Sequence, residues 1–252
     1  MDSKQRTTKI VFNEVLIRRI VYAIFRALTE DFPQARRGNR METNNRFRMA
    51  AGDFVNENLR SLVVDENVTL IPFSRGGWEG RILVDNLENV TYSIMRGKTL
   101  HNAIKNKKRL TPYYLQTLLV NENGDCRGRS KQLHLFGEEP TLFSKEEFKE
   151  DFDQIMQGQI DKTKDYRHYT FVYETKKNEI IDIRLLFLDG DYAEIDSADL
   201  KLYLTPDFAS LTSNVYEEQK HIEANVKEKH NGGLVKVRPG VKPLLRDKEQ
   251  EA

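Results

Sequence analysis

Cysteine is almost absent from this sequence of 252 residues, which contains Cys126 and no other. A single cysteine excludes an intramolecular disulfide and a zinc site made of several cysteines. It also favours a reducing compartment, and we therefore expect a cytoplasmic protein. Long apolar runs are missing as well. No window of the sequence approaches the roughly 18 apolar residues that cross a membrane, so we expect no membrane partner.

The sequence also lacks the common catalytic signatures. It contains no Walker phosphate-binding loop and no nucleophilic serine elbow. Its five histidines are scattered, and no two of them stand three or four residues apart, as a helical metal site requires. Four acidic residues lack the spacing of an EF-hand loop, and we expect them to form a solvated turn: Asp189, Asp191, Glu194 and Asp196. We accordingly expect no catalytic residue, no metal and no cofactor, and a non-enzymatic role is favoured.

Charge is what the sequence does have, and it is divided unevenly. Residues 1–137 hold 23 Lys and Arg against 14 Asp and Glu, whereas residues 138–252 hold 17 against 25. The net charges of these parts are +9 and −8, so the total of +1 conceals a basic half and an acidic half. A basic region of this kind favours contact with the phosphates of nucleic acid or with an acidic protein.

Positive charge is concentrated in three stretches of the basic half. Residues 36–48 contain five arginines and one acid, Glu42. No acid occurs between Asn89 and Asn121, and a third basic stretch covers residues 127–131. From these stretches we predict a set of cations that neutralise phosphate with little discrimination between bases: Arg36, Arg37, Arg40, Arg46, Arg48, Lys105, Lys107, Lys108, Arg109, Arg127, Arg129 and Lys131.

Residues 99–120 are predicted to form two helices, and this pair has two interpretations. In a helix-turn-helix, the second helix would present four side chains to a DNA groove: Tyr113, Tyr114, Gln116 and Thr117. In an ordinary helical hairpin, its leucines would pack in the core. The hairpin is favoured, because recognition helices usually carry several Arg, Asn or Gln residues and this one offers a single Gln.

Trp78 is the only tryptophan and stands between glycines. Such a residue is either a platform on which a ligand stacks or an apolar plug beneath a loop. The plug is favoured, because a large apolar side chain gains most from burial.

Helical spacing of apolar residues predicts a helix over about 9–30, closed before Pro33, and a second helix over about 43–63. Alternation predicts a strand at 68–73, placed at a sheet edge by Pro72, and a hairpin at 81–85 and 90–95. Ser144 and Glu147 form a capping box that begins the next helix. Three strands are predicted within 166–195.

Asp196 or Ser197 is expected to cap a helix through Leu204, and a polar helix is predicted from about 211 to 229. The fold class is therefore α+β: N-terminal helices with a small antiparallel sheet, followed by a second antiparallel β-meander flanked by helices. We expect a basic region at 1–137, an acidic meander at 138–238 and an irregular tail at 239–252. A single continuous domain with both sheets joined stays open.

The order of helix, edge strand and hairpin in residues 43–96 resembles the restriction-endonuclease superfamily. The resemblance implies a metal-dependent nuclease in which Asp85 binds the metal. The acid-x-Lys motif expected on the next strand is absent, and Ser93-Ile94-Met95 stands there instead. An active site would need Glu57 and Asp85 to approach within ~5 Å, close enough for both to reach one cation. Otherwise the chain would be a degenerate relative that does not cleave.

The sequence thus predicts an intracellular binding protein of bacterial or phage origin, whose basic half contacts DNA, RNA or an acidic partner. A nuclease and a pure protein-interaction module are the two alternatives.

Overall fold

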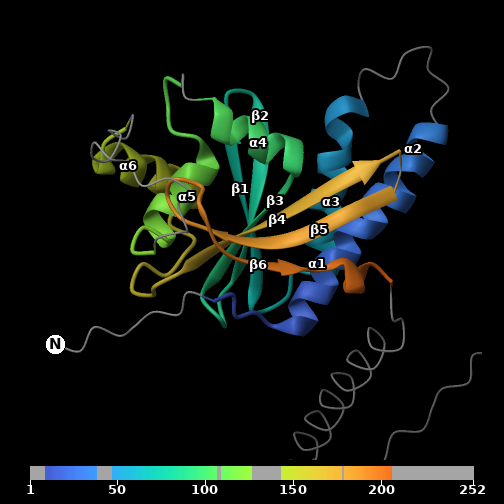
Figure 1. The fold of residues 1–252 in the computed structure, drawn as a ribbon, viewed down its shortest axis with the longest axis horizontal. Helices are drawn as coiled ribbons and strands as arrows, with labels where there is room; N and C mark the ends of the chain where they lie inside the picture. Colours follow the sequence, from blue (N-terminus) through green and yellow to red (C-terminus); the bar gives the residue numbers. More distant parts are fainter. Residues whose placement is uncertain (1–8, 39–46, 107–108, 127–142, 178, 206–252) are drawn as a thin grey trace, which may run out of the picture. The chain divides into compact units, whose positions relative to one another are not determined.

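The computed structural model describes residues 9–38, 47–106, 109–126, 143–177 and 179–205. These residues are built around one sheet of six strands in the order β1-β2-β3-β4-β5-β6 (Figure 1). The strands are β1 Val68–Arg75, β2 Trp78–Asp85, β3 Val90–Arg96, β4 Arg167–Lys176, β5 Glu179–Leu188 and β6 Glu194–Asp199.

A parallel pair joins the two halves of this sheet. β3 pairs with β4 in parallel, and every other neighbouring pair is antiparallel. The expectation of two separate sheets is therefore corrected, whereas the mixed α+β class is confirmed. The reason is the long connection from β3 to β4, which contains helices and returns the chain to the starting end of the sheet, as parallel neighbours require.

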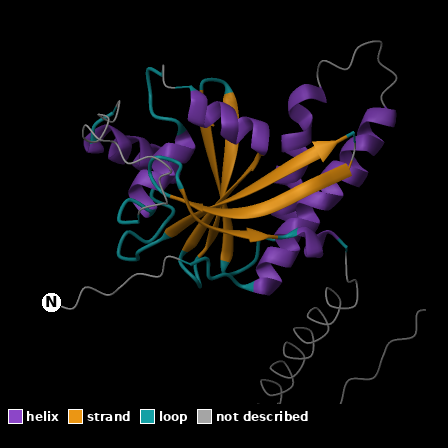
Figure 2. Cartoon of the chain, in the orientation of Figure 1, coloured by secondary structure: helices purple, strands orange, loops and turns teal. Residues whose placement is uncertain are grey.

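The helices form two groups that cover opposite faces of the sheet (Figure 2). One face carries α1 Glu14–Arg26, the π-helical turn η1 Ala27–Asp31, α2 Phe32–Gly38 and α3 Phe47–Leu62. The other face carries α4 Gly97–Lys105, α5 Tyr114–Glu122 and α6 Lys145–Met156. A 3-10 turn, η2 Lys201–Leu204, follows β6.

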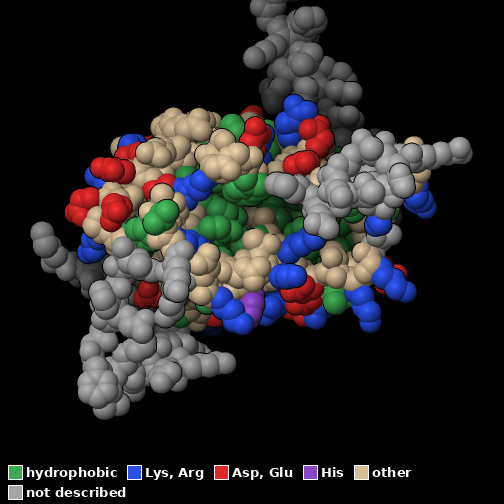
Figure 3. Space-filling view, turned by 90° about the horizontal axis from the view of Figure 1, so that it is seen from above, with side chains coloured by type: hydrophobic (Ala, Val, Ile, Leu, Met, Phe, Trp, Pro, Cys, Tyr) green, Lys and Arg blue, Asp and Glu red, His purple; other side chains and the backbone are tan. Residues whose placement is uncertain are grey.

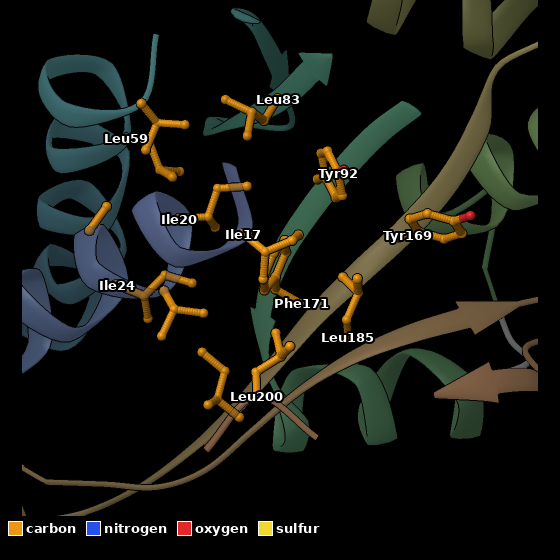
Figure 4. Packing of buried hydrophobic residues seen from close by; sticks show 14 of the residues in the cluster. Ile17, Ile20, Ile24, Leu59, Leu83, Tyr92, Tyr169, Phe171, Leu185 and Leu200 are labelled. Carbon is orange, nitrogen blue, oxygen red and sulfur yellow. The ribbon is translucent and has the colours of Figure 1, made fainter. Parts of the chain in front are cut away.

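Each face of the sheet has its own hydrophobic core, because successive strand residues point to opposite sides. Tyr92 and Phe171 pack with Ile17 and Ile20 of α1 in the first core (Figure 4). The second core contains Met95 and other strand residues packed with the leucines of α5.

Pro33 does not end the first helical segment, which corrects the sequence prediction. The chain passes from α1 through the π-helical turn, in which the Phe32 N–H donates to the Ala27 carbonyl, five residues earlier. Pro33 then lies in the first turn of α2, where a missing N–H is tolerated. The helical path therefore continues to Gly38.

Residues 194–199 are a strand rather than the start of a helix, which is a second correction. Their alternating exposure fits an edge strand paired with β5. The other edge is β1, which contains Pro72 as predicted, and the capping box of Ser144 and Glu147 is confirmed at the start of α6. The predicted polar helix at 211–229 and the tail lie outside the described residues. In the described part of the chain, no helix has the length and apolarity that crossing a membrane requires.

Candidate nucleic-acid interface

α4 presents cations at one end of the sheet. It follows directly on β3, and its Leu100 and Ala103 are buried against the second core region. Arg96, Lys98 and Lys105 are exposed, and within the described part of the chain none of the three forms an ion pair. Lys105 lies in the last turn of α4, where the helix dipole favours a positive charge.

The segment from α1 to α2 runs antiparallel to α3 and ends at the same end of the sheet. Arg19 in α1 donates to the carbonyls of Leu62 and Val63, at the end of α3. Further along, Phe32 packs edge-to-face on Phe54, with ring centroids 6.0 Å apart. The segment therefore ends beside the first turns of α3. Because α3 leads to the start of β1, its own first turn lies at the end where β1 finishes (Figure 1).

Arg36 and Arg37 occupy the last turn of α2 and are exposed. They lie at the sheet end where β1, β3 and β4 finish and β2 begins, which is also the end that carries α4. We call this region the basic end and define it by its described cations: Arg36, Arg37, Arg96, Lys98 and Lys105. The fold thus brings the first and second basic stretches to one end of the sheet.

Seen from the basic end, Lys and Arg side chains stand around a hollow lined by hydrophobic side chains (Figure 3). Carboxylates occur at this end too. Glu79 is exposed and pairs with Arg81, with 3.5 Å between the side-chain atoms. Glu174 and Glu179 flank the β4–β5 turn together with exposed Lys176 and Lys177. The surface is therefore mixed around the β4–β5 turn and positive along α4.

Two cations of the second stretch have structural contacts instead. Arg109 donates to the Ala103 carbonyl at 2.9 Å, and its guanidinium lies 4.4 Å from the ring centroid of Tyr113. Arg75 bonds to the Pro112 carbonyl and to Asp151. Arg109 therefore fixes the connection between α4 and α5, and we do not count it among the exposed phosphate-binding candidates.

Seven of the twelve predicted binding residues lie outside the described residues: Arg40, Arg46, Lys107, Lys108, Arg127, Arg129 and Lys131. Arg48 is described only as part of the first turn of α3. Arg96 and Lys98, which the prediction did not include, are exposed beside Lys105. Their sequence signal was the acid-free interval in which they stand.

The helix-turn-helix interpretation does not fit the structure. Tyr114 and Thr117, two of the proposed groove-reading residues, are 5% and 0% exposed. α5 packs between the sheet and α6, so that it cannot enter a groove. The ordinary helical hairpin is the better description of this pair.

An aromatic cluster lies beside α4 at the same end of the sheet. Trp78 contacts Phe73, with ring centroids 5.5 Å apart, and Tyr114, with centroids 5.4 Å apart. Tyr113 adjoins Tyr114 at 4.7 Å. Burial raises the pKa of Tyr113, although the nearby Arg109 guanidinium acts against this effect. Trp78 itself is 39% exposed, so it is not the buried plug favoured by the sequence.

The two carboxylates that a nuclease would need have separate local roles. Asp85 accepts hydrogen bonds from the backbone N–H groups of Leu87 at 2.9 Å and Glu88 at 3.1 Å, and thereby caps the β2–β3 turn. Glu57 pairs with Arg60 at 2.8 Å on the exposed side of α3. Among the residues that the structure describes, no three His, Cys, Asp or Glu are grouped as metal ligands.

The acidic turn after β5 is stabilised from within. Asp189 is buried, and its Oδ1 accepts from the backbone N–H groups of Asp191 at 2.9 Å and Ala193 at 2.8 Å. The predicted turn is confirmed, but its first acid is a buried turn cap rather than a solvated group.

A polar cluster is enclosed between β3, β4 and α5. His168 is fully buried, with Nδ1 2.7 Å from Thr91 Oγ1 and Nε2 2.9 Å from Ser93 Oγ. Glu122 bonds to the same Thr91 hydroxyl. These groups resemble a catalytic arrangement in composition, but each is less than a tenth exposed. Their arrangement therefore serves the core rather than a substrate.

No curated protein and no solved structure matches this sequence. A family model matches residues 9–252, a span that includes every described residue. The chain belongs to this family, DUF5986, a family of unknown function.

Proposed function

We propose that this protein binds nucleic acid without cleaving it, through contacts between the basic end and phosphate groups. One observation carries the proposal. Two basic stretches that are distant in the sequence reach the same end of the sheet, and their described cations Arg36, Arg37, Arg96, Lys98 and Lys105 are exposed.

The chemistry of α4 fits a polyanion. Lysine and arginine carry their charges on long stems, and they attract phosphate most strongly where no carboxylate competes. Thr99 and Asn102 are exposed on the same helix and can donate hydrogen bonds to phosphate oxygens. Such contacts fix the position of a nucleic acid without reading its sequence. We therefore expect binding with little preference between base sequences.

Binding without cleavage is favoured over the nuclease alternative by the roles of the carboxylates. Asp85 caps a turn and Glu57 pairs with Arg60, so that neither carboxylate is held for a metal. We place the protein in the cytoplasm of a bacterial or phage-infected cell, because its single cysteine fits a reducing compartment.

The test is to measure binding of random-sequence DNA and RNA to the full chain at two salt concentrations. Each phosphate neutralised on a duplex contributes about 0.9 to the slope of log K against log salt. Five cations predict a slope of at most about −4 to −5. A flat salt dependence, or no binding at low salt, would contradict the proposal. Conversion of the nucleic acid to shorter products with Mg²⁺ would instead favour the nuclease.

A further inference from the structure

The position of Trp78 suggests a ligand that stacks on it. Trp78 begins β2 and pairs with Arg75 across a two-residue turn of Gly76 and Gly77. Both glycines have positive φ, 56° and 80°, as tight hairpin turns require. This turn fixes the backbone of Trp78 at the basic end.

The indole ring is supported from below. Phe73 and Tyr114 are 4% and 5% exposed, whereas Trp78 above them is 39% exposed. Phe73 meets Trp78 edge-to-face, and the Tyr114 ring is tilted by 36° against it. Gly80 makes room for this packing, because a Cβ at this position would lie 2.7 Å from Cη2 of Trp78. The ring is therefore held in place before any ligand arrives.

The strand register places Trp78 near the cations of α4. β2 and β3 are neighbouring antiparallel strands, so the start of β2 and the end of β3 lie at the same end of the sheet. Their described pairing covers Leu83–Asp85 and Val90–Tyr92, and the segments nearer the basic end are not paired with each other. The hollow lined by hydrophobic side chains is seen from this same end (Figure 3).

We infer that the ligand is a single-stranded nucleic acid, whose phosphates contact the cations of α4 while one unpaired base stacks on Trp78. This inference rests on the proposed function and adds the class of nucleic acid. Stacking on an aromatic side chain is open to every base, because each base has a π face, but duplex bases are already stacked on one another. The combination of exposed cations with a fixed aromatic ring therefore favours a single strand.

The test uses the fluorescence of Trp78, the only tryptophan of the chain. Full-length protein is titrated with a twelve-nucleotide oligothymidine, with an abasic oligomer of the same length and charge, and with a blunt hairpin duplex. We expect the oligothymidine to quench the fluorescence and to bind about tenfold tighter than the abasic oligomer, equivalent to about 1.4 kcal/mol.

Two variants complete the test. Trp78→Ala is expected to bind oligothymidine about tenfold more weakly than the wild type, while its affinity for the abasic oligomer stays the same. Trp78→Phe keeps a ring and is expected to retain most of the affinity. Leu87→Ala is the matched control, because Leu87 is also exposed (64%) but lies in the β2–β3 turn at the other end of the sheet.

The outcomes separate the two proposals. Equal binding of oligothymidine and abasic oligomer without quenching would overturn the stacking inference and leave the proposed function standing. Tighter binding of the duplex would also overturn the inference. If none of the three probes binds at low salt, both proposals are wrong.

Discussion

His168 Nε2 lies 2.9 Å from Ser93 Oγ, so that a fully buried imidazole connects the parallel strands β3 and β4. This pair joins the two halves of the sheet, which are distant in sequence. An apolar core would tolerate several registers of two strands, whereas a hydrogen-bonded polar pair fits only one. The contact therefore helps to specify how the halves are aligned.

Ser93→Ala removes this hydroxyl and leaves a ring nitrogen of His168 without its partner. We expect the free energy of unfolding to fall by about 1–3 kcal/mol, because an unsatisfied buried polar group keeps its desolvation cost. Urea unfolding measures the change. Ser74→Ala on the exposed side of β1 is the control and should change stability by less than about 0.5 kcal/mol. Equal effects of the two substitutions would contradict the role assigned to Ser93.

Asn123 holds β4 and β5 to the end of α5. Its side-chain amide donates to the carbonyls of His168 and Leu188, both at 2.8 Å, and its Oδ1 accepts from the His168 N–H at 3.0 Å. Asn123→Ala leaves three buried backbone groups unpaired, and we expect a loss of roughly 3 kcal/mol or more in thermal or urea unfolding. Asn67→Ala, at an exposed position, should have little effect. A loss below about 1 kcal/mol at Asn123 would contradict this account.

Gly80 and Gly52 give a matched pair of alanine substitutions with opposite signs. An added Cβ at Gly80 meets the rings of Phe73 and Trp78, so we expect destabilisation by about 1–3 kcal/mol and a shift of the Trp78 emission spectrum. Gly52 is exposed within α3 and nothing lies within 4 Å of its added Cβ. Gly52→Ala should stabilise by about 1 kcal/mol. The same sign for both would show that the aromatic packing is not as described.

Asp65 makes stability depend on pH in the acid range. Partial burial would raise its pKa, but hydrogen bonds from Arg19 at 2.8 Å and from the N–H groups of Asn67 and Val68 outweigh this effect and lower it. Because the pKa is lower in the folded state, the contribution is present above the unfolded value of about 4 and is lost as pH falls through the folded value.

The stabilisation of wild type over Asp65→Asn should therefore be larger at pH 7 than at pH 2 in urea unfolding. Arg19→Gln keeps the carboxylate but removes one donor, and should reduce this pH dependence. An equal difference at both pH values would contradict the assignment.

Local features of the fold could be predicted from the sequence because their causes are local. The capping box of Ser144 and Glu147, the edge strand with Pro72 and the alternation of Tyr169, Phe171 and Tyr173 are examples. The parallel pairing of β3 with β4 depends on long-range contacts, and β6 is fixed by its pairing with β5. Neither is encoded in a short window.

The candidate site was predictable only as a charge bias. The sequence marks the acid-free interval that contains Lys98, Lys105 and Arg109, but tertiary contacts decide that Lys105 is exposed while Arg109 lies against Tyr113. The exposure of Trp78 likewise depends on Phe73 and Tyr114, which occupy the space beneath it.

The most direct test of the central claim compares two double variants of equal charge change. Arg96→Gln with Lys98→Gln alters the basic end, whereas Lys162→Gln with Lys164→Gln alters exposed lysines near the β2–β3 turn, where Lys164 contacts the Asn86 carbonyl. The measured quantity is the slope of log K against log salt for binding of oligothymidine. We predict that the first pair makes the slope shallower by about 2, or about 1 per lost phosphate contact, and that the second leaves it unchanged. Equal slopes for the two variants would contradict binding through the basic end.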